Sequence, residues 1–281
     1  MYAGKAPLVS VVTVNLNDAV GLGRTAKSIQ SQSKKLEWIV VDGHSGDNSR
    51  AVAEEFLVGM KGCILEVPPE GIYSAMNFGA GEATGEWIWF LNSGDYVFLP
   101  DNFEKLLTHL ENSKSDLITS TVYHVTPSGF LFSISKPNIS NAQLEANHQG
   151  VLVKRRLFEK IGGFDLSLKL AADGKFLDTV AQQAAIDEFA EPFVAFELGG
   201  RSGTRYRETI NEIKRYRGQE YSTKKTSFFL KNTIRLSLIN YSGRILRVFI
   251  NQYFKYREQR IIRSELNGRD YIQKIREAHL S

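Results

Sequence analysis

Three segments in the first hundred residues are apolar at nearly every position: Leu8–Asn15, Leu36–Asp42 and Glu86–Leu91. Unbroken β-branched and apolar runs of this length are typical of strands buried on both faces. Between them lie segments that predict helices over Ala19–Ser31, Asn48–Met60 and Ser74–Gly81 and a short strand over Cys63–Val67. Strands that alternate with helices predict an α/β fold with a parallel sheet and right-handed crossovers.

The pattern is looser after Pro100. We expect helices over Phe103–Ser113, Leu157–Ile161, Ala171–Ala184 and Tyr206–Arg217, and strands over Asp116–His124, Phe130–Ser135 and Phe193–Leu198. The pair Gly162-Gly163 ends the second of these helices, as glycine commonly does. No internal repeat or low-complexity linker interrupts the chain, so one domain extends through the sheet-forming region.

Charge divides the chain into an acidic body and a basic tail. Residues 1–206 contain 18 Lys and Arg against 24 Asp and Glu, whereas residues 207–281 contain 17 against 7. Within the tail, Phe228–Tyr256 mixes aromatic and aliphatic residues with Lys and Arg. This mixture is typical of a helix that lies in a membrane interface on anionic headgroups. A helix that packs on the body or on another subunit of a homo-oligomer explains the same pattern. We therefore predict a main domain over 1–206 and a helical tail over 207–281.

The remaining composition narrows the class of protein. Hydrophobic residues make up 42% of the chain and charged residues 23%, as in ordinary soluble proteins. The single cysteine, Cys63, excludes an intrachain disulfide and a cysteine-cluster metal site, and it fits a reducing cytoplasm. The N-terminal segment lacks the pattern of a signal peptide. The longest uncharged stretches of the tail, Leu236–Gly243 and Val248–Phe254, are too short to cross a bilayer. We expect a cytoplasmic protein that touches the inner face of the plasma membrane.

One glycine motif is misleading. Gly21-Leu22-Gly23-Arg24-Thr25-Ala26 matches the G-x-G-x-x-A pattern of dinucleotide-binding folds. In those folds the first glycine ends the strand itself, so that the helix N-terminus meets the pyrophosphate. Here Leu16–Val20 intervene. The match therefore does not predict a nicotinamide-cofactor site.

Polar clusters follow three of the predicted strands, where ligands bind in open α/β sheets. They are Asn15-Leu16-Asn17, Asp42-Gly43-His44-Ser45-Gly46-Asp47 and Asn92-Ser93-Gly94-Asp95. Asp42 is placed to accept hydrogen bonds from a base or a ribose, while Asp47 or Asn48 caps the following helix. Asp95 is placed to hold Mg²⁺ or Mn²⁺ that bridges to a diphosphate. Ordinary turns with capping carboxylates explain each cluster taken alone.

Five separated motifs carry a family resemblance. VSVVTVNLND, IVVDGHSGDNS, EGIYSAMNFGAGEATGEWIWFLNSGD, HQGVLVKRRLFEKIGGFD and LAAD occur in this order over residues 7–205. The chain resembles the family 2 inverting glycosyltransferases of the GT-A fold and, more narrowly, bacterial enzymes of colanic-acid and related capsular polysaccharide assembly. The resemblance implies a Rossmann-like mixed sheet flanked by helices. It also implies inverting hexosyl or deoxyhexosyl transfer from a UDP- or GDP-sugar to a lipid-linked saccharide in capsule or exopolysaccharide biosynthesis.

The resemblance also implies roles for particular residues. Asp42 matches the carboxylate that contacts the nucleobase, Asp95 the metal ligand and Asp173 the base that activates the acceptor. Tyr73 and Asn77 match residues that line the nucleotide-sugar pocket. We expect the donor site to contain Thr13, Asn15, Asn17, Asp42, Ser45, Tyr73, Asn77, Asn92, His148 and Arg201.

Some positions depart from the family pattern. Relatives often carry two acidic residues before the metal-binding Asp, whereas this chain has Asn92 and Gly94. Asp95 is then the lone carboxylate, so strict metal dependence does not follow. Relatives usually continue Ala-Ala-Asp with Tyr-Asp, whereas Gly174-Lys175 follow here, and Asp165 is the alternative base.

Two further segments have open interpretations. His148-Gln149 is expected in the acceptor or pyrophosphate wall, although a buried structural histidine fits equally. Arg201 lies in a glycine-rich loop that is either a lid closing on the diphosphate or an ordinary surface loop.

Two other classes of protein compete with the glycosyltransferase hypothesis. A nucleotidyltransferase requires basic residues directly after the first strand, and Leu16–Ala19 contains none. A nucleic-acid-binding module accounts for the basic tail but leaves the carboxylates at the strand ends without a purpose. Sugar transfer accounts for both carboxylates, because it requires neutralisation of a developing diphosphate charge and removal of a hydroxyl proton.

Overall fold

One sheet organises the computed structural model, which describes residues 6–32, 34–125, 131–140, 143–198 and 205–218. Its nine described strands run in the order β3-β2-β1-β4-β10-β6-β11-β5, with β7 paired on β6. They are β1 (Val9–Asn15), β2 (Leu36–Asp42), β3 (Lys61–Glu66), β4 (Trp87–Phe90), β5 (Tyr96–Val97), β6 (Leu117–Val125), β7 (Leu131–Ser135), β10 (Val151–Lys154) and β11 (Ile186–Glu197). A separate ribbon pairs β8 (Asn138–Ser140) with β9 (Gln143–Glu145).

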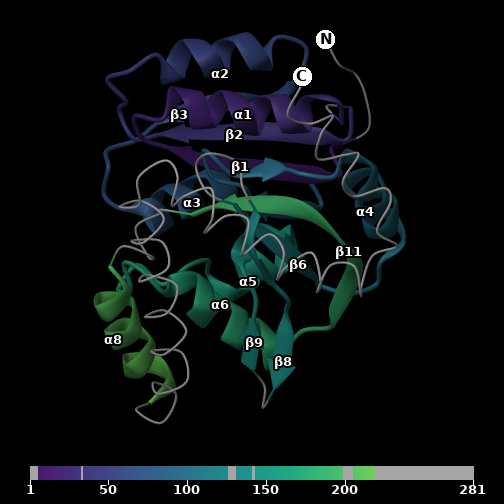
Figure 1. Ribbon diagram of the computed structural model, residues 1–281, viewed down its shortest axis with the longest axis vertical. Coiled ribbons are helices and arrows are strands. Elements are labelled where there is room, and N and C mark those ends of the chain that lie inside the picture. The colour runs from purple at the N-terminus through teal and green to yellow at the C-terminus, as the bar shows by residue number, and fades with distance from the viewer. Residues whose placement is uncertain (1–5, 33, 126–130, 141–142, 199–204, 219–281) are drawn as a thin grey trace, which may run out of the picture.

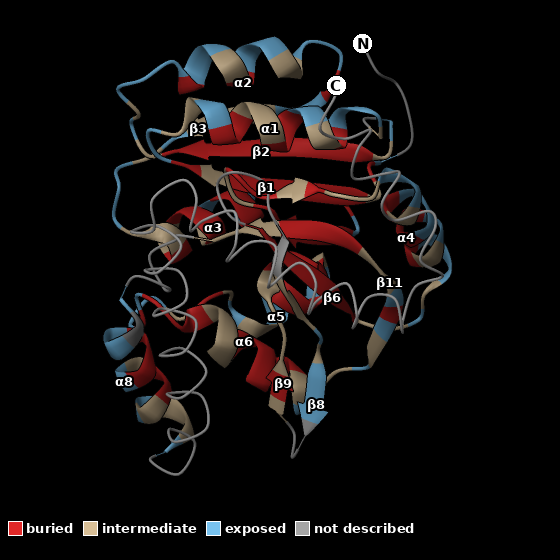
Figure 2. Cartoon of the chain, in the orientation of Figure 1, coloured by how far each residue is buried: buried red, intermediate tan, exposed pale blue. Residues whose placement is uncertain are grey.

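Helices cover both faces of this sheet (Figure 1). One apolar core joins the sheet to α1 (Ala19–Gln30), α2 (Ser49–Leu57) and α4 (Pro100–Asn112). A second core joins the other face to α3 (Ile72–Gly81), α5 (Arg155–Ile161) and α6 (Ala172–Ala181). Every residue of β2 and β4 is buried, as the red strands of Figure 2 illustrate. The unbroken apolar runs therefore arise because both faces of these strands are covered.

The sheet is mixed, although the alternation of strands and helices predicts a parallel one. β1, β2, β3 and β4 are parallel, but β10 lies antiparallel between β4 and β6. The sequence pattern misses β10 because it is a four-residue strand that leads directly into α5. The mixed sheet implied by the family resemblance is therefore present, and its parallel half contains the strands with polar ends.

Most predicted elements are present with shifts of a few residues. β11 differs most, because it begins at Ile186 rather than Phe193. Its first half is half-buried or exposed, and its pairing with β6 shifts register between Phe189 and Val194, around Pro192. Such a segment lacks a continuous apolar pattern. The short elements β5, β8, β9 and η1 (His148–Gly150) also have no such pattern.

The helix α8 (Tyr206–Arg217) is packed on the body beside α6 (Figure 1). Arg217 forms a two-nitrogen ion pair with Asp178 of α6, and the two side chains are only 4% and 10% exposed. Glu145 of β9 lies 3.5 Å from the same guanidinium. The predicted domain boundary at residue 206 therefore falls at the first residue of α8, a helix that packs on the preceding domain. Residues 219–281, which include most of the expected tail, lie outside the described residues.

Arg217→Ala is expected to destabilise the fold by about 3–5 kcal/mol, because it leaves the Asp178 carboxylate buried without its charge partner. Urea unfolding measures the loss. Arg215→Ala on the same helix is the matched control, since Arg215 is exposed and its removal should change stability by about 0.5 kcal/mol or less. Equal stability of the two variants would show that α8 does not depend on this ion pair.

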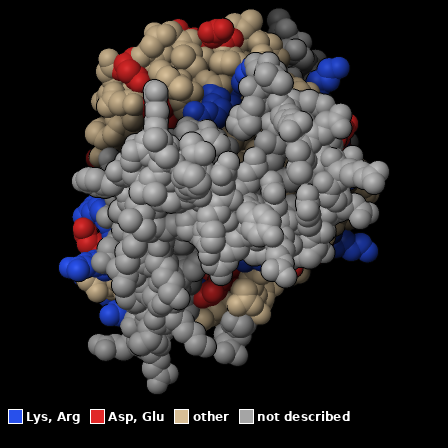
Figure 3. Space-filling model, viewed as in Figure 1, with Lys and Arg blue, Asp and Glu red and all other residues tan. Residues whose placement is uncertain are grey.

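Among the described residues, no helix combines the length and the apolarity needed to cross a bilayer. On the face drawn in Figure 3, the described Lys and Arg side chains are interspersed with Asp and Glu side chains.

Candidate functional site

The polar strand ends predicted from the sequence meet at one edge of the sheet. Asn15 and Asp42 are paired in register at the carboxyl ends of β1 and β2. The turn after β4 continues beside β1, where the Ser93 N–H donates to the Val14 carbonyl. β2 and β4 flank β1 on opposite sides, so the order of the strands changes direction at β1. Open α/β sheets form their ligand crevice at such a point.

Asp42 is the centre of a hydrogen-bonded network at this edge. Its Oδ1 accepts from the Asn15 side-chain amide at 2.8 Å and from the Ser45 hydroxyl at 2.7 Å, and its Oδ2 accepts from the Ser45 N–H at 2.7 Å. The side-chain oxygen of Asn15 is buried and has no hydrogen-bond partner among the described residues. An unpaired buried acceptor is costly, so a donor group of a bound ligand would stabilise it.

Asn17 and Asp47 join the loops that surround this network. Asn17 adopts the left-handed conformation with φ of 54°, and its side-chain oxygen accepts from the Gly46 N–H at 2.7 Å. Asp47 accepts from the Ser49 N–H at 3.0 Å and from the Ala19 N–H at 2.9 Å. Asn48 is the N-cap residue of α2 and makes no side-chain cap hydrogen bond. Asp47, one residue earlier, instead accepts from the first N–H of α2 and from the first N–H of α1.

The N-terminus of α1 is covered by carboxylates of the protein itself. Asp18 accepts from the Gly21 N–H at 2.9 Å, and Asp47 accepts from the Ala19 N–H. A Cβ at Gly21 would lie 2.0 Å from Asp18 Oδ2, so this glycine is required by the cap. A pyrophosphate has no place beside these negative charges, and the glycine motif therefore serves the local packing of α1 rather than a dinucleotide.

Asp95 lies at the end of the turn after β4 and is only 3% exposed. Its Oδ2 accepts from the Gln149 side chain and its Oδ1 from the Glu197 N–H, both at 3.0 Å. Burial raises the pKa of the Asp95 carboxyl to about 7, although these hydrogen bonds and the nearby His148 oppose the rise. A cation near this carboxylate would favour its charged form.

Asp173, at the first turn of α6, is held by three donors. Its Oδ1 accepts from the Tyr73 hydroxyl at 2.9 Å and from the Gly174 N–H at 2.8 Å, and its Oδ2 lies 3.2 Å from His148 Nδ1. Burial opposes ionisation, but the hydrogen bond and charge of His148, together with the Tyr73 and Gly174 donors, lower the pKa of the Asp173 carboxyl below its ordinary value. The side chain is 30% exposed, so a ligand can reach a carboxylate that is ionised at neutral pH.

The short helix η1 connects the two carboxylates. His148 lies between Asp173 and Asn92, whose side-chain nitrogen is 3.3 Å from His148 Nε2. The next residue, Gln149, donates to Asp95. Asn92 also has a buried side-chain oxygen without a partner among the described residues. The structure thus brings Asn92, His148, Asp95 and Asp173 into one connected group, together with Tyr73.

Two residues expected in the donor site have other roles in the structure. Thr13 is fully buried, and its hydroxyl accepts from the Trp38 indole N–H at 2.9 Å. Asn77 exchanges two hydrogen bonds with the backbone of Phe164, at 2.9 and 2.8 Å, and thereby ties α3 to the loop after α5. Both residues thus use side-chain polar atoms within the fold, and their place in the donor site stays a prediction. Arg201 lies outside the described residues.

Asp165, the alternative base, is bound to other groups. Lys175 donates to its Oδ2, and the Ser167 N–H donates to its Oδ1 at 2.9 Å. The Lys175 hydrogen bond is the main reason that the pKa of Asp165 falls to about 2. Asp165 is thus ion-paired with Lys175, whereas Asp173 is joined to His148 and Asn92, which favours Asp173 as the base.

A divalent metal at this edge of the sheet needs coordinating atoms from a bound substrate in addition to those of the protein. Within the described part of the chain, no three His, Cys, Asp or Glu side chains gather as a metal site. Asp95 and the unpaired side-chain oxygen of Asn92 offer the hard oxygen ligands that Mg²⁺ and Mn²⁺ prefer. The remaining ligands would have to come from a diphosphate and water, as is usual for Mg²⁺ beside substrate phosphates.

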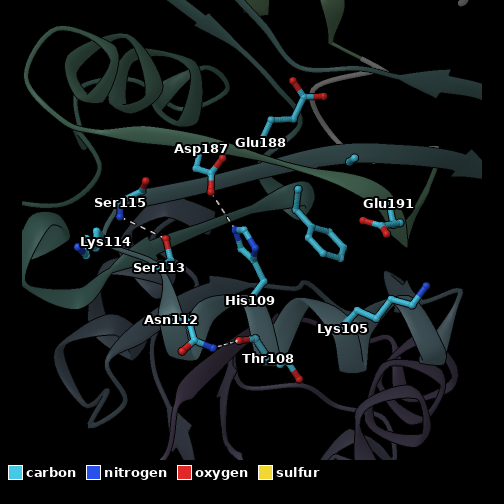
Figure 4. A pocket seen from close by; sticks show the side chains of 12 residues that line it. Lys105, Thr108, His109, Asn112, Ser113, Lys114, Ser115, Asp187, Glu188 and Glu191 are labelled. Atoms are coloured by element: carbon cyan, nitrogen blue, oxygen red, sulfur yellow. Dashed lines mark hydrogen bonds and ion pairs between the residues drawn. The ribbon is translucent and has the colours of Figure 1, made fainter.

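A groove at the opposite edge of the sheet is separate from this site. It has a volume of about 770 Å³ and lies between the end of α4 and the start of β11 (Figure 4). At its centre His109 Nε2 is 2.9 Å from Asp187 Oδ2. Because Ile186 pairs with Leu117 at the amino ends of β11 and β6, the groove lies away from the carboxyl ends that hold Asp42 and Asp95.

The sequence did not single out Glu197 and Asp18, and it placed Gln149 in the acceptor or pyrophosphate wall without indicating its contact with Asp95. Gln149 stands beside His148 in a motif, but nothing in the pattern indicates that it binds Asp95. Glu197 contributes its backbone N–H, for which side-chain chemistry gives no signal. Asp18 was an unassigned member of the first motif, and an Asp before a helix is a recognisable cap signal.

Comparisons with known proteins agree with this geometry. The family model described as "Glycosyl transferase family 2" matches residues 10–167. The chain is 34% identical over 181 residues to a glycosyltransferase of Mycobacterium tuberculosis, covering 61% of this chain and 68% of the relative. It is 30% identical over 213 residues to a PGL/p-HBAD biosynthesis glycosyltransferase of the same species, covering 71% and 80%.

Solved structures show the same fold. S. aureus TarS in complex with UDP-GlcNAc superposes with a TM-score of 0.60 and 16% identity, covering 83% of this chain and 73% of that one. The mannosyltransferase PcManGT from Pyrobaculum calidifontis, in complex with GDP-Man and Mn²⁺, superposes with a TM-score of 0.59 and 13% identity, covering 98% and 88%. The expected GT-A fold is confirmed.

Proposed function

Since this chain belongs to glycosyl transferase family 2, we propose that it transfers a hexosyl or deoxyhexosyl group from a UDP- or GDP-sugar to a saccharide, with inversion at the anomeric carbon. The observation that carries the proposal is the connected pair of carboxylates at the edge of the sheet. Asp95 is buried with a raised pKa, whereas Asp173 is accessible with a lowered one. Two carboxylates with pKa values pushed apart suit two different tasks.

The donor is proposed to lie along the ends of β1, β2 and β4. Asp42, ordered by Asn15 and Ser45, would face the base or ribose, and the unpaired oxygen of Asn15 would accept a hydrogen bond from the nucleotide-sugar. Solved neighbours hold UDP, UDP-GlcNAc and GDP-Man, which supports a donor of this class. Asp95 and Asn92 would hold Mn²⁺ or Mg²⁺, which when bound neutralises charge on the diphosphate.

The base is proposed to be Asp173. The acceptor oxygen forms a bond to the anomeric carbon as the bond to the diphosphate oxygen breaks, and the nucleoside diphosphate leaves with that electron pair. The acceptor proton passes to the Asp173 carboxylate. Tyr73 and Gly174 hold Oδ1, while His148 beside Oδ2 connects the base to Asn92. A single displacement with one base gives inversion.

The acceptor and the location remain proposals from the sequence. We propose a lipid-linked saccharide in capsule or exopolysaccharide assembly, reached from the cytoplasmic face of the plasma membrane. The segment 228–256 would supply the contact with anionic lipid, and it lies outside the described residues. The prediction of a possible homo-oligomer and the expectation of no nucleic-acid partner likewise stay predictions.

Thermal-shift measurements with UDP, GDP, NAD and a single-stranded oligonucleotide, each with and without Mn²⁺, test the proposal. A ligand that binds only the folded state stabilises it and raises Tm. At a ligand concentration of 100 Kd the stabilisation is about 2.7 kcal/mol. We expect a shift with UDP or GDP that Mn²⁺ enlarges, and none with NAD. A shift with NAD or the oligonucleotide alone would contradict the proposal.

A further inference from the structure

We propose that Glu212 of α8 is a positioning residue for the base, because it fixes the segment Lys169–Ala171 that leads into α6 and Asp173. The inference rests on the proposed role of Asp173. Nothing in the motif pattern of the chain indicates it, because α8 follows the last of the five motifs and belongs to the expected tail.

The Glu212 carboxylate binds three consecutive backbone N–H groups. It accepts from Lys169 at 3.0 and 3.1 Å, from Leu170 at 2.8 Å and from Ala171 at 3.1 Å. Hydrogen bonds to an ionised acceptor are roughly twice as strong as neutral ones. The N-cap of α6, Ala171, has no side chain able to cap the helix. A carboxylate from another helix therefore fixes the entry into α6, two residues before Asp173.

A second contact lies on the other side of Asp173. A Cβ at Gly174 would lie 2.7 Å from the Tyr216 hydroxyl oxygen, so only glycine lets α8 approach this closely without a shift. The Gly174 N–H donates to Asp173 Oδ1. This contact gives a physical reason for the departure from the family pattern at residue 174. Tyr216 and Glu212 are four residues apart and therefore lie on the same face of α8.

The two contacts enclose the base between them. Glu212 holds residues 169–171 and Tyr216 abuts residue 174, while Tyr73 and His148 bind the carboxylate itself. Glu212 makes its hydrogen bonds to the backbone of residues 169–171 and none to Asp173 itself. Displacing a reacting group by 1 Å can cost about 10² in rate, so small movements of this segment matter.

The first experiment compares Glu212→Gln and Glu212→Ala with wild type and with Glu208→Gln. Glu208 is on the same helix, half exposed and paired with Arg205, so it serves as the matched control. We expect kcat to fall by about 10² in Glu212→Ala and by less in Glu212→Gln, which retains one accepting oxygen. The donor KM and the Kd for UDP or GDP should be unchanged.

The second experiment tests the contact at residue 174. Gly174→Ala should lower kcat, although alanine is otherwise preferred in a helix. Tyr216→Phe removes the colliding oxygen and should have activity near that of wild type, and the double variant should recover most of the loss. This series keeps Glu212 intact, so it decides the question even where Glu212→Ala does not fold.

The outcomes separate this inference from the proposed function. Full kcat in folded Glu212→Ala and in Gly174→Ala would overturn the positioning role, while an inactive Asp173→Asn would leave the base in place. Loss of donor affinity in proportion to the loss of kcat would show a merely structural role for Glu212. Full activity of Asp173→Asn would overturn both the base and its positioning.

Discussion

Asp173→Asn is expected to reduce kcat by a factor of about 10² or more and to leave donor affinity unchanged. Asparagine is nearly isosteric, and its oxygen can still accept from Tyr73 and Gly174, so only the proton acceptor is lost. Steady-state kinetics and calorimetric titration with UDP or GDP measure the two quantities separately. Because the pKa of Asp173 is lowered, its ionisation should not limit wild-type activity between pH 5 and 8.

Asp165→Asn is the matched control for this prediction. Asp165 follows the same motif but is bound by Lys175 and the Ser167 N–H, so its replacement should leave kcat nearly unchanged. A large loss in Asp165→Asn with normal turnover in Asp173→Asn would reverse the assignment. Loss of donor affinity with little change in turnover would make Asp173 a binding residue.

The parallel half of the sheet could be predicted because each of its long strands is buried on both faces. Leu36–Asp42 is a strand over the predicted residues, and every one of them is buried. Burial on both faces leaves an apolar run that a single sequence displays directly. The polar residues that end these runs could be located for the same reason, and Asn15, Asp42, Asn92 and Asp95 are at one edge as expected.

The antiparallel half could not be predicted in the same way. β10 has four residues and adjoins a helix, and the first half of β11 is half-buried around Pro192. Their pairing is decided by tertiary contacts with β4 and β6 rather than by a local pattern. The same holds for α8, whose charged face suggests a solvated tail until Arg217 and Glu212 are seen bound to α6 and to the segment before it.

The positions of polar side chains could be predicted where a residue ends a strand, whereas contacts with partners distant in sequence could not. Asn77 belongs to a motif of the donor pocket, yet its amide is taken up by Phe164, 87 residues away. Thr13 is on a strand that reaches the site, yet its hydroxyl faces Trp38 in the core. A motif shows that a residue type is required at a position, whereas only the fold shows which of its atoms are already bound.

Asp95→Asn is expected to abolish transfer and, without metal, to raise Tm at pH 8. Burial raises the pKa of Asp95 from 3.8 to about 7, so the folded state binds a proton that the unfolded state releases above pH 4. Stability therefore falls as pH rises from about 4 to about 7, by at most a few kcal/mol, and remains low above that. Asparagine cannot ionise, so the variant should lack this fall.

Differential scanning calorimetry between pH 4 and 8, with and without Mn²⁺ and UDP or GDP, tests this prediction. Ligand and metal should raise the Tm of the wild type at pH 8 and have little effect on Asp95→Asn, because the variant lacks the carboxylate that the cation requires. Asp47→Asn is the control of opposite sign. Hydrogen bonds from Ser49 and Ala19 lower the pKa of Asp47, so its replacement should lower Tm at pH 8. A lower Tm for Asp95→Asn at pH 8, or full transfer at low Mn²⁺, would mean that Asp95 is a satisfied structural carboxylate and that the donor diphosphate is neutralised by other groups.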